Sequence, residues 1–98
     1  MAVNLNRWDA SEYLETTEDM LGYLDEAFRS GDTALLQAAL GDIAKAKGMA
    51  EVARSAGVGR ESLYKSLSAA GNPSFQTIAK VVNALGGQLS VTPKQPAA

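Results

Sequence analysis

The fold is decided by the stretch of residues 49–67, which reads MAEVARSAGVGRESLYKSL. Two short helices that meet at a steep angle need a small residue where they touch, and Ala53 provides it. The turn between them needs a residue that tolerates positive φ, which is Gly57, followed by an apolar anchor, which is Val58. The rest of the inner face is apolar and consists of Val52, Ala56, Leu63 and Leu67. This spacing predicts a helix-turn-helix; the alternative is a short helical hairpin that matches the pattern by chance.

Polar residues occupy the side of the second helix that would face solvent. These candidate DNA-binding residues are Gly59, Arg60, Glu61, Ser62, Tyr64 and Lys65. Arg60 can donate two hydrogen bonds to guanine O6 and N7, and Glu61 can accept one from cytosine N4. The other side chains can bond phosphates or base edges. The alternative for each is a solvated surface residue, and Glu61 and Lys65 also have the i,i+4 spacing of a helix-stabilising ion pair.

The charged residues divide the chain into two halves of opposite sign, although its net charge is only −2. Residues 1–42 contain two basic and nine acidic residues, a net charge of −7. Residues 43–98 contain seven basic and two acidic residues, a net charge of +5. This division predicts a basic half that faces DNA and an acidic half that faces away from the phosphate backbone, toward a basic partner. The alternative is that charges cluster by chance on solvated helices.

The composition excludes several classes of protein. The chain has 98 residues, of which 46% are hydrophobic and 20% are charged, as is ordinary for one globular domain. It contains neither cysteine nor histidine, the residues that most often serve as nucleophiles, bases and zinc ligands. We therefore expect no enzyme activity, no metal and no cofactor. No apolar run approaches the ~20 residues that span a bilayer, and residues 1–6 show no secretory signal, so we expect a cytoplasmic protein with no membrane contact.

Start and stop signals predict three further helices around the central stretch. Their N-caps are Thr17, Asp32 and Ser74, and the glycines that end them are Gly31, Gly48 and the pair Gly86 and Gly87. Each helix has an apolar face at helical spacing. These faces consist of Met20, Leu21, Leu24, Ala27 and Phe28; of Leu36, Ala39, Leu40, Ile43 and Ala44; and of Phe75, Ile78, Val81, Val82 and Leu85. The helices of the central stretch are expected over residues 49–56 and 60–68.

The C-terminal residues show a different pattern. Residues 88–92 alternate, with Leu89 and Val91 on one side, and this predicts a short strand. A lone strand leaves unpaired edges that a second copy of the chain can satisfy, so this strand is the expected dimer element. We expect a single domain over residues 1–98, in which 1–31 form an acidic helical segment, 32–86 the helix-turn-helix core and 87–98 the strand and tail.

The N-terminal residues leave two questions open. Asp9 could cap a short turn that runs to Leu14. Trp8 and Tyr13 belong either to the core, the interpretation we favour, or to an anchor for a partner. The acidic residues there are Glu12, Glu15, Glu18 and Asp19. They form a solvated face, a patch for a basic partner or a site for a divalent ion.

From about Tyr13 to Leu89 the chain resembles the probable addiction-module antidote family of bacterial helix-turn-helix proteins, and is similar to HigA-type antitoxins. The matching stretches are EYL at 12–14, YLDEA at 23–27, AALGDIA at 38–44, RESLYK at 60–65 and GNPSF at 71–75. The resemblance implies an all-α, lambda-repressor-like fold, a double-stranded DNA operator in the module's own promoter, and a partner toxin of the RelE/ParE-like ribonuclease class. Members often have Ser or Thr at the position of Gly59, where glycine permits the cap geometry without a side-chain oxygen.

The sequence thus predicts a transcriptional repressor that is also the antitoxin of a type II toxin–antitoxin module. We expect a homodimer because one short recognition helix reads few base pairs and a two-fold symmetric operator supplies the rest. A toxin that binds RNA is expected to be small and basic, so the acidic half is the surface suited to it. The first alternative is a phage-type helix-turn-helix repressor with no toxin. Further alternatives are a protein-interaction domain that has lost DNA binding and, last, an enzyme.

Overall fold

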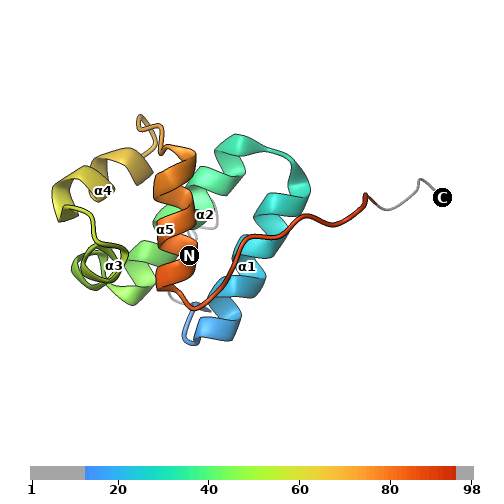
Figure 1. The fold of residues 1–98 in the computed structure, drawn as a ribbon, viewed down its shortest axis with the longest axis horizontal. Helices are drawn as coiled ribbons and strands as arrows, with labels where there is room; N and C mark the ends of the chain where they lie inside the picture. The colour runs from blue at the N-terminus through green and yellow to red at the C-terminus, as the bar shows by residue number, and fades with distance from the viewer. Residues whose placement is uncertain (1–12, 95–98) are drawn as a thin grey trace, which may run out of the picture.

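The computed structural model describes residues 13–94, and this part of the chain consists of five α-helices joined by short loops (Figure 1). The helices are α1 (Thr17–Ser30), α2 (Thr33–Lys47), α3 (Met49–Ala56), α4 (Arg60–Leu67) and α5 (Phe75–Ala84). α1 and α2 pack side by side, α5 packs against α3, and α4 contacts both α2 and α3. The predicted all-α fold class is confirmed.

The first helix begins one residue earlier than the sequence predicts. Thr16, not Thr17, is the N-cap: its hydroxyl accepts a hydrogen bond from the backbone N–H of Asp19 at 3.0 Å. The Asp19 carboxylate in turn accepts a bond from the backbone N–H of Thr16 at 3.3 Å. Only Thr16 has an acidic residue at the third helical position, since Met20 stands there for Thr17, so only Thr16 can close this reciprocal capping box.

The other helix ends follow the local signals closely. Gly31 ends α1 in the left-handed conformation, with φ 74°. Asp32 caps α2 by accepting from the backbone N–H groups of Ala34 and Leu35, and Ser74 caps α5 by accepting from that of Thr77. α3 has the predicted bounds, and α4 ends one residue early because Ser68 is its C-cap. These boundaries are determined by short-range hydrogen bonds, which is why the sequence alone predicts them.

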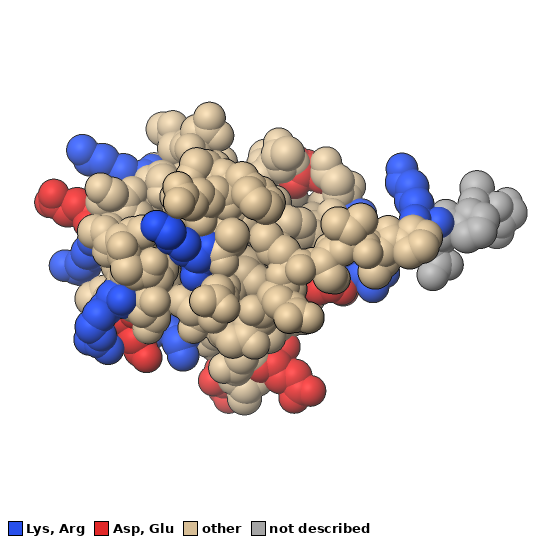
Figure 2. Space-filling view, in the orientation of Figure 1, with Lys and Arg blue, Asp and Glu red and all other residues tan. Residues whose placement is uncertain are grey.

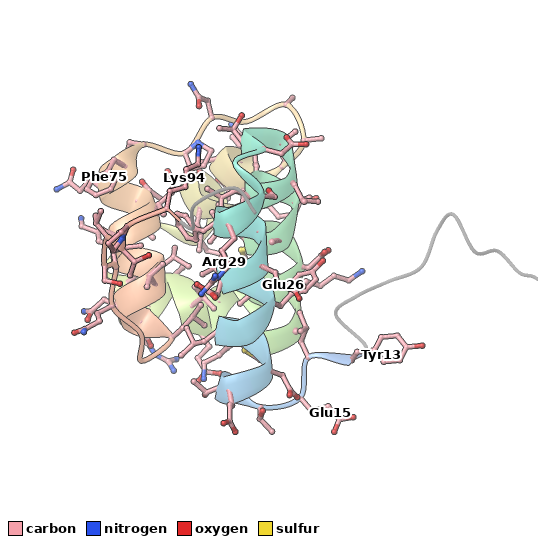
Figure 3. All side chains as sticks on the ribbon, turned by 90° about the vertical axis from the view of Figure 1, so that its right-hand side faces the viewer. Tyr13, Glu15, Glu26, Arg29, Phe75 and Lys94 are labelled. Atoms are coloured by element: carbon pink, nitrogen blue, oxygen red, sulfur yellow. The ribbon has the colours of Figure 1, made fainter. Side chains whose placement is uncertain are left out.

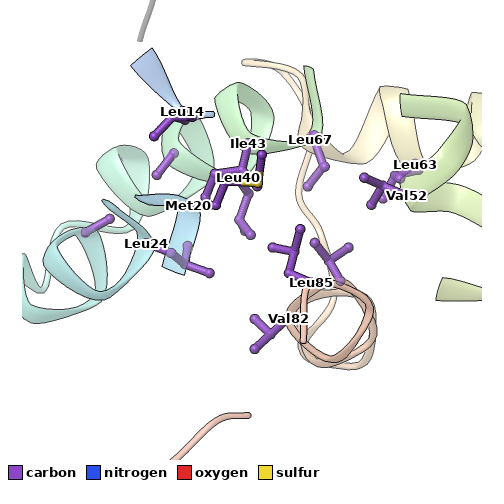
Figure 4. Packing of buried hydrophobic residues seen from close by; sticks show 14 of the residues in the cluster. Leu14, Met20, Leu24, Leu40, Ile43, Val52, Leu63, Leu67, Val82 and Leu85 are labelled. Atoms are coloured by element: carbon purple, nitrogen blue, oxygen red, sulfur yellow. The ribbon is translucent and has the colours of Figure 1, made fainter. Parts of the chain in front are cut away.

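One hydrophobic core joins all five helices (Figure 4). Its most deeply buried large side chains are Leu40, Ile43, Val52, Leu63 and Val81. Most residues of the predicted apolar faces belong to it, but Phe75 is 74% exposed. Burial along the inner face of α5 fades toward its first turn, from Val81 at 0% exposure through a half-buried Ile78. The prediction that Phe75 is buried is therefore wrong, because the core covers α5 only from Ile78 onward.

The predicted strand over residues 88–92 is also wrong: among residues 13–94 there is no strand. After Gly87, whose N–H donates to Val82 O at 3.0 Å, the chain runs as an extended coil past α1 (Figure 1). A strand needs a neighbouring strand to bond with, and residues 13–94 supply none. Leu89, 37% exposed, helps to line a groove with Leu21 and Phe28 of α1, whereas Val91 is 97% exposed.

Candidate nucleic-acid interface

The turn between α3 and α4 is built by glycine and backbone hydrogen bonds. Gly57 has φ 73° and ψ 33°, and its N–H donates to Arg54 O at 3.2 Å. The next N–H, of Val58, reaches back to Ala53 O at 3.0 Å. Together these two bonds form a Schellman motif, whose left-handed residue is most easily glycine. The predicted role of Gly57 is therefore confirmed.

The inner faces of α3 and α4 hold this pair of helices on the core. Leu63 and Leu67 of α4 are 1% and 5% exposed, and Val52 and Ala53 of α3 are equally buried. Ala56 and Val58, which the sequence places on the same face, are half-buried at its edge. Since α4 has only 8 residues, its position depends on these few apolar contacts.

The start of α4 has no side-chain cap. Gly59 is the N-cap with φ −71° and ψ 141°, and its carbonyl accepts from the N–H of Leu63 at 2.9 Å. No side chain satisfies the first N–H groups of this helix. A ligand with acceptor oxygens can therefore bind these N–H groups directly.

The six candidate residues lie together on the outer surface of α4 and its N-cap, and all are exposed. They occupy two flanks. Arg60, Glu61 and Tyr64 line an open groove of about 670 Å³ between α4 and α2, whereas Ser62 and Lys65 lie on the opposite flank, beside Gly71. Within the described residues, no ion pair joins Glu61 to Lys65, although these residues have the i,i+4 spacing of such a pair.

The groove is also lined by residues that the sequence analysis did not select, among them Lys45 and Met49. Lys45 comes from the last turn of α2, and Met49 is the first residue of α3. These two residues were missed because they lie outside α4 in the sequence. The one available signal was that Lys45 belongs to the basic half of the chain. Lys and Arg side chains gather over α3 and α4 with a few carboxylates among them, and further acidic side chains lie near the start of α1 (Figure 2). The groove is thus lined by two cations, Lys45 and Arg60, by the carboxylate of Glu61, and by apolar side chains such as Met49.

On the acidic side, several carboxylates have partners within the protein. Asp19 belongs to the capping box of α1, and Asp25 accepts from Arg29 Nε at 2.8 Å. Asp42 accepts from the Tyr23 hydroxyl at 2.8 Å. Burial of Tyr23, together with this hydrogen bond and the nearby carboxylate charge, raises the pKa of Tyr23 to about 12. These bonds join α1 to itself and to α2.

Other acidic-side residues point away from the protein. Tyr13 is 61% exposed, so the expectation that it belongs to the core is wrong; Figure 3 shows it and Glu15 projecting away from the helices. Glu18 and Glu26 are exposed and have no ion-pair partner among residues 13–94. The three further N-terminal candidates, Trp8, Asp9 and Glu12, lie outside the described residues. In the described part of the chain, no three carboxylates cluster closely enough to hold a metal ion, and no helix there is long and apolar enough to cross a membrane.

Comparison with known proteins places the chain in a family. A family model described as "Probable addiction module antidote protein" matches residues 4–93. A protein of Haemophilus influenzae (strain ATCC 51907 / DSM 11121 / KW20 / Rd), described as uncharacterized, is 44% identical over 91 residues, which cover 93% of this chain and 94% of that protein. No solved structure matches the chain. Because the family model spans nearly all of the sequence, the chain belongs to the probable addiction module antidote protein family.

Proposed function

We propose that this protein is the antitoxin of a type II toxin–antitoxin module: it binds an operator in its own promoter through α3 and α4, represses transcription there, and neutralises a RelE/ParE-like toxin in the cytoplasm. Membership of an antidote family supports the antitoxin role. The observation that carries the DNA-binding role is the outer surface of α4, where Arg60, Ser62, Tyr64 and Lys65 are all exposed on one helix.

The geometry of α4 suits insertion into a major groove. The groove of B-DNA admits one α-helix, and here α4 is buried only along one side, by Leu63 and Leu67. In this proposal Arg60, at the first helical position, would contact guanine, and Glu61 beside it would contact cytosine. Lys65 on the other flank would contact phosphate. In this proposal α3 and α4 form a helix-turn-helix, with α4 as the recognition helix.

A homodimer is part of the proposal, since two copies of α4 would read two half-sites. The extended segment after Gly87 is the candidate contact between the copies. Leu89 and Val91 remain exposed there, and no backbone hydrogen bond within residues 13–94 pairs residues 88–92 with a neighbouring segment. A second copy could bond the backbone groups of this extended coil and cover Leu89 and Val91.

The toxin would bind on the acidic side, away from α4. Like charges repel the phosphate backbone, so α1, which carries Glu18 and Glu26 without ion-pair partners in the described residues, is suited to a basic protein rather than to DNA. Exposed Tyr13 near the start of this helix is a candidate anchor. The two partners would then occupy opposite sides of the protein.

A mobility-shift assay with the chain's own upstream DNA tests the operator role. We expect the wild-type chain to prefer this duplex over a scrambled one, and Arg60→Ala to weaken binding by about 1–3 kcal/mol. Arg29→Ala is the matched control, because it removes the same charge from α1. Equal binding of the wild-type chain to both duplexes would contradict the operator role.

Co-purification with the product of the neighbouring gene tests the antitoxin role. A complex with a small basic protein would support it. A repressor of the same architecture without a toxin would instead bind the upstream DNA and would not co-purify with the product of the neighbouring gene. A chain that bound only protein would correspond to an interaction domain without DNA binding.

A further inference from the structure

The end of α4 is held by a side chain from another helix. Gln37, half-buried in the second turn of α2, donates from Nε2 to the carbonyl of Ser68, the C-cap of α4, and to the carbonyl of Gly71 at 2.8 Å. Both hydrogens of this amide group are therefore in use. The Ser68 carbonyl also accepts from the N–H of Gly71 at 2.9 Å. One side chain thus ties α2 to both the end of α4 and the loop that follows it.

The loop is pressed tightly onto the last turn of α4. A Cβ atom built on Gly71 would lie 2.1 Å from Lys65 O and 2.5 Å from Ser66 O, so only glycine fits there. Gly41 of α2 makes a second close approach, since its Cβ would lie 3.2 Å from Leu67 O. The end of α4 is therefore fixed against α2 through backbone groups, close to Lys65 and Tyr64.

The start of α4 lacks comparable support, since Gly59 provides no side-chain cap. Two apolar side chains, Leu63 and Leu67, hold a short helix down, but they constrain its tilt poorly because apolar contact is not directional. Hydrogen bonds from a side-chain amide are directional. Gln37 is the side chain that supplies such bonds from α2 to the end of this helix.

We propose that Gln37 is a positioning residue for operator recognition: it sets the angle at which α4 meets the DNA without contacting the DNA itself. This rests on the proposed operator binding. It assigns a specificity role to a residue of α2, one turn before Gly41, which lines the groove together with Arg60 and Tyr64. A change at Gln37 should then lower the preference for the operator and leave sequence-independent binding to phosphates intact.

The test compares Gln37→Met, which keeps the length of the side chain and removes both donors, with Gln76→Met on the exposed surface of α5. Binding is measured to a duplex of the chain's own upstream region and to a scrambled duplex of the same length. We expect Gln37→Met to bind the upstream duplex about ten-fold more weakly, as if one base contact were lost. Its affinity for the scrambled duplex should stay within about two-fold of wild type. Gln76→Met should bind both duplexes as the wild type does.

Residual dipolar couplings of α4 relative to α2, measured by NMR without DNA, give a second readout. We expect a reorientation of α4 in Gln37→Met while the other helices keep their alignment. An upstream-duplex affinity within about two-fold of wild type, or an equal loss with both duplexes, would overturn the proposal, the latter because it indicates a general structural role. If the wild-type chain does not prefer its upstream duplex, the proposed operator binding is wrong, and the operator role of Gln37 is wrong as well. The dipolar couplings would still show separately whether Gln37 orients α4.

Discussion

α1 and α4 differ in how far each helix stabilises itself. α1 has 14 residues, a reciprocal capping box at its start, a left-handed glycine at its end and an internal Asp25–Arg29 ion pair. α4 has 8 residues, no side-chain cap at its start, and an end held by Gln37 from α2. Isolated helices as short as α4 are marginal in water. The helix proposed to read DNA is therefore the one whose position depends most on the rest of the fold.

The charges of the two helices differ in the same way. On α1, Asp19 and Asp25 bond within the helix and its cap. On α4, Arg60 and Lys65 have no ion-pair partner among residues 13–94. Part of the acidic charge thus stabilises the protein itself, whereas the cations of α4 remain available to a ligand. Four changes, in order of expected effect, test this difference.

The largest effect is expected from Gly57→Val. A β-branched residue at φ 73° is strained, and we expect a loss of about 2–3 kcal/mol of unfolding free energy, seen as a melting temperature lower by roughly 10 °C or more. Gly31→Val, at φ 74° after α1, is the matched control and should lose similar stability. At a temperature where both variants are folded, only Gly57→Val should weaken operator binding. Equal operator affinities would show that the α3–α4 turn does not control recognition.

The second largest effect is expected when charged residues are neutralised on one side of the protein at a time. Arg60→Ala with Lys65→Ala should weaken operator binding by about 1–3 kcal/mol for the base contact alone and spare toxin binding. Glu15→Gln with Glu18→Gln and Glu26→Gln should slow toxin association, most clearly at low salt, and leave operator affinity equal or slightly higher. Asp19 is kept because neutralising it would open the capping box. If the toxin association rate at low ionic strength were unchanged, the acidic side would be only a solvated surface and not a toxin-binding one.

A smaller effect is expected from Tyr23→Phe, which breaks the 2.8 Å bond to Asp42 between α1 and α2. We expect a loss of about 1 kcal/mol at neutral pH. The pKa of Tyr23 is raised to about 12 from an unfolded value of 10.0, so its stabilising contribution is complete below pH 10 and is lost as the pH rises toward 12. Chemical denaturation of the wild type should show this extra loss, and Tyr23→Phe should not. If the unfolding free energies of the two proteins depended on pH in the same way, the loss at high pH would not come from ionisation of Tyr23.

The smallest effect is expected from Gly22→Ala. Gly22 lies inside α1 and is exposed, and a Cβ atom added to it would meet no other atom within 4 Å, unlike one added to Gly41 inside α2. Alanine should therefore stabilise the protein by about 0.5–1 kcal/mol and leave operator affinity unchanged. Thermal melting and the mobility shift measure the two quantities. If the same variant also bound the toxin more weakly, the toxin would contact α1 at Gly22. A lower melting temperature would instead show that Gly22 does not have room for a Cβ atom.

The sequence predicted the features that depend on near neighbours. Gly31, Asp32 and Gly57 act through bonds to residues within a few positions, so the helix ends were correct to within a residue. The predicted N-cap Thr17 was wrong by one residue, because the reciprocal capping box closes between Thr16 and Asp19. The helical spacing of the apolar residues likewise identified most of the core, because one face of each helix must be buried.

The candidate site was predicted in part for the same reason. The side of α4 that carries Arg60 and Lys65 is the side opposite its two buried leucines, and this follows from helical spacing alone. Lys45 and Met49 reach the same groove from α2 and α3, and only the packing of three helices brings them there. Whether these residues bind DNA stays a prediction for the assays above.

What the sequence by itself determined is therefore local: five helices, their ends, the glycine turn at Gly57 and the division of charge along the chain. Only the tertiary structure decided that Phe75 is exposed, that residues 88–92 run past α1 as a coil, and that Gln37 holds the end of α4. The physical reason is the range of the interactions. A cap or a turn is closed by atoms a few residues apart, whereas burial, strand pairing and the bonds of Gln37 need partners from distant segments, and these come together only when the core forms.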